Sequence, residues 1–229
     1  MGGGLSTQLL RPGLLEGVSL LLAAAPERTV ATAAEEVEGV PLLAGVPVVD
    51  VAATVAERCA RLSARVASCA PISEHGAVAD EGELDEAVAA VAREAGGVDL
   101  LAVDGAGLLA HGLGSDGDGH RALRACMDGA WNATRAVVNR AFLAVEPSHG
   151  RVVYLAPAPD AGSHADAARA GLENLARTLS TEWARHGITT VTIAPGRQTS
   201  PDELATLVAY LASPGGAYFS GCLLDLRGV

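Results

Sequence analysis

The stretch SHADAARAGLENLARTLSTEWARHGITTVTIAPG, residues 163–196, decides the fold class. Its first part repeats Ala and Leu at helical spacing and predicts a helix over 165–186. Its second part, 189–193, is a short run of Thr, Val and Ile that predicts a strand, and a Pro-Gly pair follows it. A helix leading directly into such a strand is typical of an α/β protein, in which helices cover a parallel sheet.

The same alternation extends along all 229 residues. Apolar runs predict seven strands, at 18–22, 47–51, 66–70, 98–103, 151–155, 189–193 and 222–226. Helical patterns between them predict helices near 29–38, 53–65, 81–95, 120–145, 165–186 and 201–212. Because this order requires right-handed crossovers, the sequence predicts an α/β fold: a single doubly wound Rossmann-like domain over 1–229. It would hold a seven-stranded parallel sheet with helices on both faces, and residues 1–16 are expected to form a flexible leader.

Two helix boundaries are especially clear. Asp80 is a predicted N-cap before the helix at 81–95, and a Gly pair follows that helix. Ser200 is a predicted N-cap with Pro201 at the first helical position.

Composition excludes several kinds of function. A formal net charge of −11 argues against a nucleic-acid partner, since that affinity depends largely on Lys and Arg contacts to phosphates. No apolar segment is long enough to cross a bilayer. The four cysteines are far apart and form no C-x-x-C pair, which indicates free thiols and a cytoplasmic location.

Five segments resemble, in this order, the short-chain dehydrogenase/reductase family. They are GGVDLLAVDGAG (96–107), WNATRAVVNRAF (131–142), GRVVYLAP (150–157), AARAGLENLARTLSTEWARHGITTVTIAPG (167–196) and DELATLVAYLASPGGAYFSGCLLDLRGV (202–229). The likeness is strongest over 167–196 and weakens toward the N-terminus. It implies a nucleotide-binding fold and, in ordinary members, an NAD(P)-dependent oxidoreductase.

The family's cofactor cradle is a glycine-rich turn after the first strand, where the main chain approaches the pyrophosphate. Ala23, Glu27 and Thr29 fall near those glycine positions in this chain. A Glu carboxylate about 4 Å from a phosphate costs roughly 1–4 kcal/mol by repulsion. Asp50 lies at the end of the predicted second strand, where family members hold the adenosine ribose, but without the cradle a helix cap or a strand-end charge is the favoured interpretation. The sequence therefore predicts no cofactor in this chain.

The resemblance also places the family's catalytic residues: a Tyr four residues before a Lys, a Ser and an Asn. The tyrosine position holds Ala165 and the lysine position Arg169. Ala156 stands at the serine position and Cys126 at the asparagine position. A positioned general acid contributes about 10²- to 10⁴-fold to rate, and alanine cannot supply it. The sequence therefore predicts no catalytic site of the family's kind.

Two further features agree with this prediction. The family's Asn-Asn-Ala-Gly loop, which supports the cofactor, reads Asp104-Gly105-Ala106-Gly107. The substrate lid that usually follows the Pro-Gly turn is missing, since RQTS leads directly to the next helix at Pro201.

Three groups of residues could form a replacement site, but simpler interpretations are favoured for each. Tyr154 lies near the missing serine, but a core tyrosine with one hydrogen bond is the better prediction. Ser163, His164 and Asp166 resemble a catalytic triad on paper, but adjacent residues at a helix start are expected to act in capping. His111, Asp116, Asp118 and His120 carry metal-ligand atoms within a glycine-rich loop, whose ordering would be costly, so no metal site is predicted.

The parts that this chain keeps are those through which family members assemble: helices 120–145 and 165–186, and the C-terminal strand. The sequence predicts a non-catalytic assembly subunit, paired with an intact family homologue that holds NAD(P) and acts on a keto/hydroxyacyl substrate, or paired with itself. A stand-alone ligand-binding or scaffold pseudoenzyme is the alternative, and an oxidoreductase with an unconventional site is the second alternative.

Overall fold

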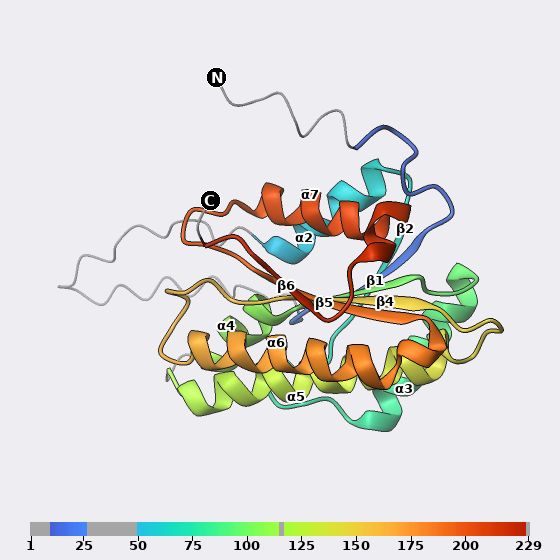
Figure 1. The fold of residues 1–229 in the computed structure, drawn as a ribbon. Helices are drawn as coiled ribbons and strands as arrows, with labels where there is room; N and C mark the ends of the chain where they lie inside the picture. The colour runs from blue at the N-terminus through green and yellow to red at the C-terminus, as the bar shows by residue number, and fades with distance from the viewer. Residues whose placement is uncertain (1–9, 27–49, 115–116, 228–229) are drawn as a thin grey trace, which may run out of the picture.

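The computed structural model describes residues 10–26, 50–114 and 117–227. These residues form a six-stranded parallel sheet with the order β2-β1-β3-β4-β5-β6 (Figure 1). The strands are β1 (Ser19–Ala23), β2 (Arg65–Cys69), β3 (Leu100–Asp104), β4 (Gly150–Leu155), β5 (Ile188–Ala194) and β6 (Cys222–Asp225). The α/β class and the parallel sheet agree with the sequence prediction.

The prediction of seven strands is wrong, because the sheet has six. The place beside β1 is taken by β2, which pairs with it from Ser19↔Arg65 to Ala23↔Cys69 and leaves no room for a strand between them. Of the strand expected at 47–51, Asp50 is the N-cap of a helix and Val51 is the first residue of that helix. Residues 47–49 and the helix expected at 29–38 lie outside the described residues.

Helices cover both faces of the sheet, as predicted (Figure 1). They are α2 (Val51–Arg61), α3 (Glu81–Ala95), α4 (Gly105–Leu113), α5 (Gly119–Val137), α6 (Ala165–Glu182) and α7 (Pro201–Ala212). Helices α2 and α7 pack on one face around Leu20, Leu22 and Val208. Helices α3, α4, α5 and α6 pack on the other face, around Leu101, Tyr154 and Leu172. Each face thus has its own apolar core.

The predicted caps at two helices are confirmed. The Asp80 carboxylate accepts hydrogen bonds from the backbone N–H groups of Gly82 and Glu83, and Gly96 ends α3 in the left-handed conformation. Ser200 and Glu203 form a capping box at the start of α7. Helix α4 was not predicted, because its sequence GAGLLAHGL is rich in glycine.

Candidate functional site

The sequence-predicted site positions gather at the carboxyl edge of the sheet. The chain passes from β1 to β2 on one side and then returns to β3 on the other side of β1. Such a reversal of strand order opens the crevice in which doubly wound proteins bind ligands. Ala23 and Asp104 end β1 and β3 beside this reversal. Ala156 follows β4, and Arg169 reaches the loops after β4 and β5 from α6.

The two alanines expected at catalytic positions of the family are enclosed by the protein. Ala156 and Ala165 are each 1% exposed. The backbone N–H of Ala156 donates to the carbonyl of Ile193, which joins the ends of β4 and β5. Neither side chain offers a proton to a substrate.

Arg169, which the sequence comparison expects at the family's lysine position, holds two loops together. Its Nη1 donates to the carbonyl oxygens of Pro157 at 2.5 Å and Pro195 at 3.1 Å, so it bridges the segments that follow β4 and β5. The side chain is buried, and its Nη2 has no hydrogen-bond partner among the described residues. Burial and the nearby Arg227 lower the pKa of Arg169, but a guanidinium remains charged in proteins and cannot relay a proton as lysine does.

Cys126, expected at the family's asparagine position, lies on α5 and is fully buried. Burial raises the pKa of its thiol to about 12, with a further contribution from Asp104. Only a thiolate is a strong nucleophile, so this cysteine is chemically inert at neutral pH.

Asp104 is the buried acid of the crevice, with 4% of its surface exposed. Its carboxylate caps α4 by accepting a hydrogen bond from the N–H of Gly107 at 2.9 Å. Burial raises the pKa of Asp104 to about 6, and the neighbouring charge of Asp50 adds to the increase even though the hydrogen bond from Gly107 opposes it. A carboxyl with such a pKa is partly protonated near neutrality.

The turn after Asp104 requires glycine. A Cβ on Gly105 would lie 2.7 Å from Leu172 Cδ1 and 2.8 Å from the carbonyl oxygen of Leu155. The main chain at the start of α4 therefore packs closely against β4 and α6.

The described residues directly after β1 include no glycine. Ala23 is buried at the end of β1, and Ala24, Ala25 and Pro26 follow it. Glu27 and Thr29, the other two cradle positions, lie outside the described residues. The favoured interpretation of Asp50 as a helix cap is confirmed, since its Oδ1 accepts from the N–H of Ala53 at 3.1 Å.

The prediction that Tyr154 is a core residue with one hydrogen bond is confirmed. Tyr154 is fully buried, and its hydroxyl lies 2.9 Å from Thr134 Oγ1. Thr134 donates its only hydroxyl proton to the carbonyl of Ala130, so the Tyr154 hydroxyl must donate to Thr134. Burial raises the pKa of Tyr154 further above its usual value, which leaves it unsuited to proton transfer at neutral pH.

Replacing Tyr154 with phenylalanine should lower the free energy of unfolding by about 1 kcal/mol, because one buried hydrogen bond is lost while the ring remains. Urea denaturation of both proteins measures the difference. A loss several times larger would mean that the hydroxyl has a role beyond this bond.

The other two candidate groups differ from expectation. His164 stands at the N-cap position of α6, but its side chain makes no hydrogen bond to the start of the helix. The capping expected of Ser163 and His164 is therefore not seen. Instead Ser163 Oγ and His164 Nδ1 lie 2.9 Å apart in a hydrogen bond. Asp166 lies close enough to Arg169 and Arg227 to favour their charged forms.

The possible metal ligands of the glycine-rich segment do not lie together, because some belong to α4 and others to the start of α5. His111 is buried on α4, with its Nε2 2.9 Å from the carbonyl oxygen of Glu74. Asp118 caps α5 by accepting from the N–H groups of His120 and Arg121, and Asp116 lies outside the described residues. Across the described ranges, no three or more His, Cys, Asp or Glu side chains are grouped as metal ligands would be.

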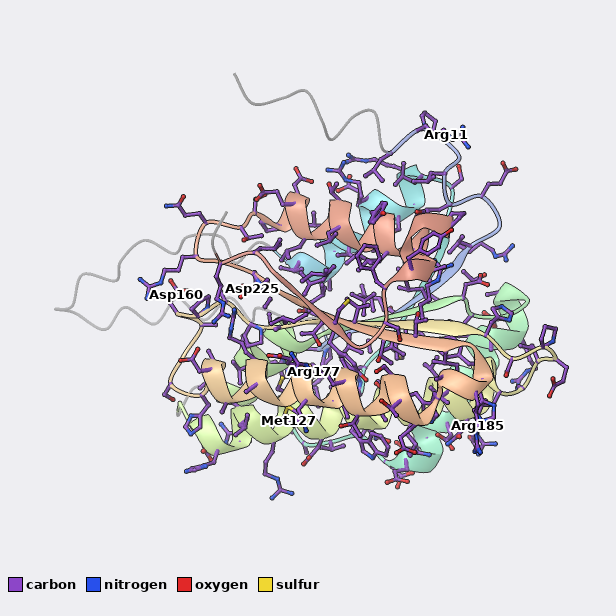
Figure 2. All side chains as sticks on the ribbon, in the orientation of Figure 1. Arg11, Met127, Asp160, Arg177, Arg185 and Asp225 are labelled. Carbon is purple, nitrogen blue, oxygen red and sulfur yellow. The ribbon has the colours of Figure 1, made fainter. Side chains whose placement is uncertain are left out.

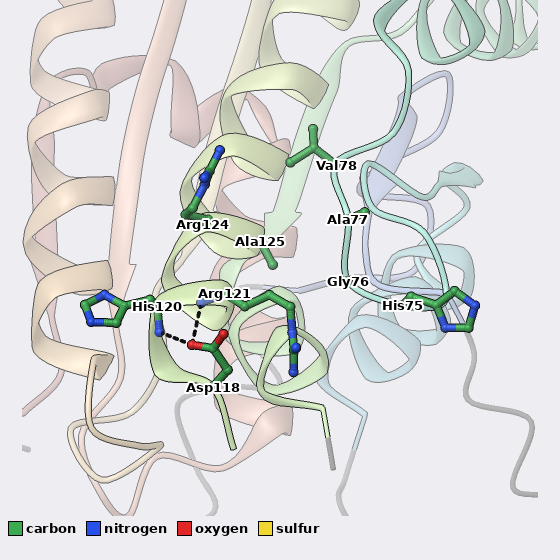
Figure 3. Close-up of a pocket in the computed structure, with 9 residues that line it drawn as sticks. All are labelled: His75, Gly76, Ala77, Val78, Asp118, His120, Arg121, Arg124 and Ala125. Carbon is green, nitrogen blue, oxygen red and sulfur yellow. Dashed lines mark hydrogen bonds between the residues drawn. The ribbon is translucent and has the colours of Figure 1, made fainter. Parts of the chain in front are cut away.

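Two surface hollows lie away from the strand-end positions. One, of about 570 Å³, runs between the loop His75–Val78 and the start of α5, where Arg121 and Arg124 line it (Figure 3). The other, of about 380 Å³, lies between α2 and α7 beside the ion pair Arg58–Asp202. Neither includes Asp104, Arg169 or Ala156.

All four cysteines are free; Cys59 and Cys126 are buried and Cys69 and Cys222 are partly buried. None of the helices in the described part of the chain is long and apolar enough to cross a membrane.

A doubly wound parallel sheet with a reversal of strand order is the Rossmann-like architecture, whose members bind ligands in the crevice at that reversal. A family model described as Enoyl-(Acyl carrier protein) reductase matches residues 43–198. The chain belongs to this family, within the short-chain dehydrogenases/reductases.

Known structures share the fold across nearly the whole chain. The citronellol catabolism dehydrogenase of Pseudomonas aeruginosa superposes with a TM-score of 0.66 at 22% identity, covering 94% of this chain and 95% of that one. A short-chain type dehydrogenase/reductase from Mycobacterium marinum gives a TM-score of 0.67 at 18% identity, covering 93% and 95%. At such identities the likeness shows the fold alone.

A sequence relative is also an oxidoreductase by name. An uncharacterized oxidoreductase of Caenorhabditis elegans is 27% identical over a match that covers 26% of this chain. The match spans 29% of that relative's length.

Proposed function

We propose that this chain is a non-catalytic subunit that assembles with an intact, NAD(P)-dependent member of its family. The proposal rests on the chemistry of the four residues expected at the family's catalytic positions. Ala156 and Ala165 have no proton to transfer, and burial keeps Cys126 protonated. Arg169 uses its guanidinium to hold the carbonyls of Pro157 and Pro195.

The electrostatics of the crevice support the same proposal. Asp50 is close enough to Asp104 for its charge to raise the pKa of Asp104. Two carboxyl groups at this edge oppose the binding of a pyrophosphate, because they add negative charge where the family supplies bare backbone N–H groups. NAD(P) would therefore be held by the partner and not by this chain.

The face formed by α5 and α6 would provide the contact. The two helices pack closely at Gly171, where a Cβ would lie 2.7 Å from Met127 Sδ, and Met127 lies between them in Figure 2. Trp131 on α5 is 44% exposed, which is unusual for so large an apolar side chain. Aromatic residues of this kind are frequent anchors of protein interfaces. The C-terminal strand β6 is the second expected contact, whether the partner is the intact homologue or another copy.

The family model that matches the chain is described as an enoyl-acyl-carrier reductase. That description supports a substrate of the acyl-thioester type for the assembled enzyme, and the keto or hydroxyacyl group is what the family resemblance implies.

Affinity purification of the tagged chain from its native host tests the proposal. We expect an intact homologue, carrying the Tyr and Lys that this chain lacks, to be recovered at nearly equal stoichiometry. Replacing Trp131 with glutamate should reduce its recovery at least tenfold, by placing a charge in the contact. Val145, which is 38% exposed and lies outside α5 and α6, is the matched control, and Val145→Glu should leave recovery unchanged. A soluble homo-oligomer with no homologue bound would contradict the proposal.

A stand-alone ligand-binding protein is the second candidate, and the hollow beside His75 and Arg124 favours it. A small molecule that raises the melting temperature of the isolated chain without any dinucleotide would support this candidate.

A further inference from the structure

Two histidines that are far apart in the sequence meet at the start of α5 and α6. His120 lies in the first turn of α5, and His164 is the N-cap of α6. Their ring centres are 5.1 Å apart, with the ring planes inclined at 56°. His120 also belongs to the lining of the hollow at the start of α5 (Figure 3). Neither ring has a part in the positions described above for the crevice.

This separation fits two ligands on one tetrahedral ion. Zinc binds imidazole nitrogen at about 2.0–2.1 Å with tetrahedral angles, which places each ring centre roughly 3.2 Å from the metal. Two such rings are then roughly 5.2 Å apart. The observed separation of 5.1 Å matches this value.

The surroundings of His164 prepare one of its nitrogens for this role. Ser163 Oγ is hydrogen-bonded to Nδ1, and when Nδ1 carries the proton the lone pair of Nε2 is left free. Histidines that bind metal usually donate their other N–H to such an acceptor, which fixes the tautomer and the ring orientation. Gly119 provides the space, because a Cβ at that position would overlap the His164 ring and crowd Ser163 Oγ.

We propose that His120 and His164 bind a divalent zinc ion, with Ser163 as the residue that orients His164. Since the described residues offer no third ligand of the His, Cys, Asp or Glu type here, water completes the tetrahedron. Such a site is open and binds in the micromolar range. The ion joins the first turns of α5 and α6, and the net charge of −11 favours cation binding. This site does not depend on the proposed assembly function.

Isothermal titration of the metal-free full chain with zinc chloride tests the site. We expect one zinc ion per chain. His120→Ala and His164→Ala should each weaken binding at least tenfold, and Ser163→Ala about tenfold by releasing the ring. All three residues lie at the surface or are only partly buried, so the variants should fold. A zinc-dependent rise in melting temperature, absent in the two histidine variants, gives a second measurement.

His149→Ala is the matched control, since His149 is also exposed but lies beside Asp99 at the other end of the sheet. Its zinc affinity should equal that of the wild type. The proposal is overturned if the wild-type chain binds no zinc, or if the double variant lacking both His120 and His164 binds it as tightly as the wild type.

Discussion

Asp104→Asn is expected to raise the free energy of unfolding at pH 8 by about 2–3 kcal/mol. The pKa of Asp104 in the folded chain is about 6, above the value of about 3.9 for an unfolded aspartate. Its contribution to stability is therefore complete below about pH 4 and is lost as pH rises through 6, since each tenfold change in proton affinity between the two states corresponds to about 1.4 kcal/mol. Asparagine can still accept the hydrogen bond from Gly107, but it carries no charge to bury.

Urea denaturation at several pH values between 4 and 8 measures this effect. The difference between the variant and the wild type should grow from near zero at the acid end to its full size above pH 7. Asp50→Asn, which keeps its capping bond to Ala53, is the control and should give a smaller gain, because it removes only the neighbouring charge. A constant difference across this range would show that Asp104 is ionised throughout.

Gly150→Ala should destabilise the chain by more than about 4 kcal/mol, or enough to prevent folding. Gly150 begins β4, and a Cβ there would overlap the ring of Phe142. Phe142 is fully buried within the core beneath α5, so its ring has no free space to move into. Circular dichroism during thermal unfolding measures the loss.

Gly82→Ala is the matched control for that variant. Its added methyl would meet only the Asp80 carboxylate, at 3.2 Å, and it lies in the first turn of α3. Because alanine favours a helix, its stability should stay near or slightly above that of the wild type. Equal losses for the two variants would contradict the packing described at Gly150.

Sequence patterns were sufficient for most of the fold because local signals agreed with one another. The strand at 189–193 was β-branched, and the caps at Asp80 and Ser200 stood where helices begin. The strand expected at 47–51 does not extend to its last two residues, because Asp50 caps a helix that begins at Val51, and the sequence VPVVDV did not reveal this cap. That error could be seen only from the pairing of β1 with β2.

For the candidate site, too, part could be predicted from the sequence and part could not. The residues at the tetrad positions followed from alignment to the family, but their contacts required the fold. Arg169 bridges Pro157 and Pro195, which lie on loops after different strands. The pKa of Asp104 is raised mainly by burial and further by the charge of Asp50, which comes from a separate element, so the sequence alone does not show this shift. The contact between His120 and His164 likewise depends on the starts of α5 and α6 lying side by side, which the sequence does not show.

The proposed loss of cofactor binding is tested most directly by titrating the isolated chain with NADPH and following the nicotinamide fluorescence. We predict no saturable change, and the same result with NADH, because Asp50 and Asp104 would add negative charge near the edge of the sheet where the family binds its pyrophosphate. A saturable rise in fluorescence with one dinucleotide per chain would contradict the proposal.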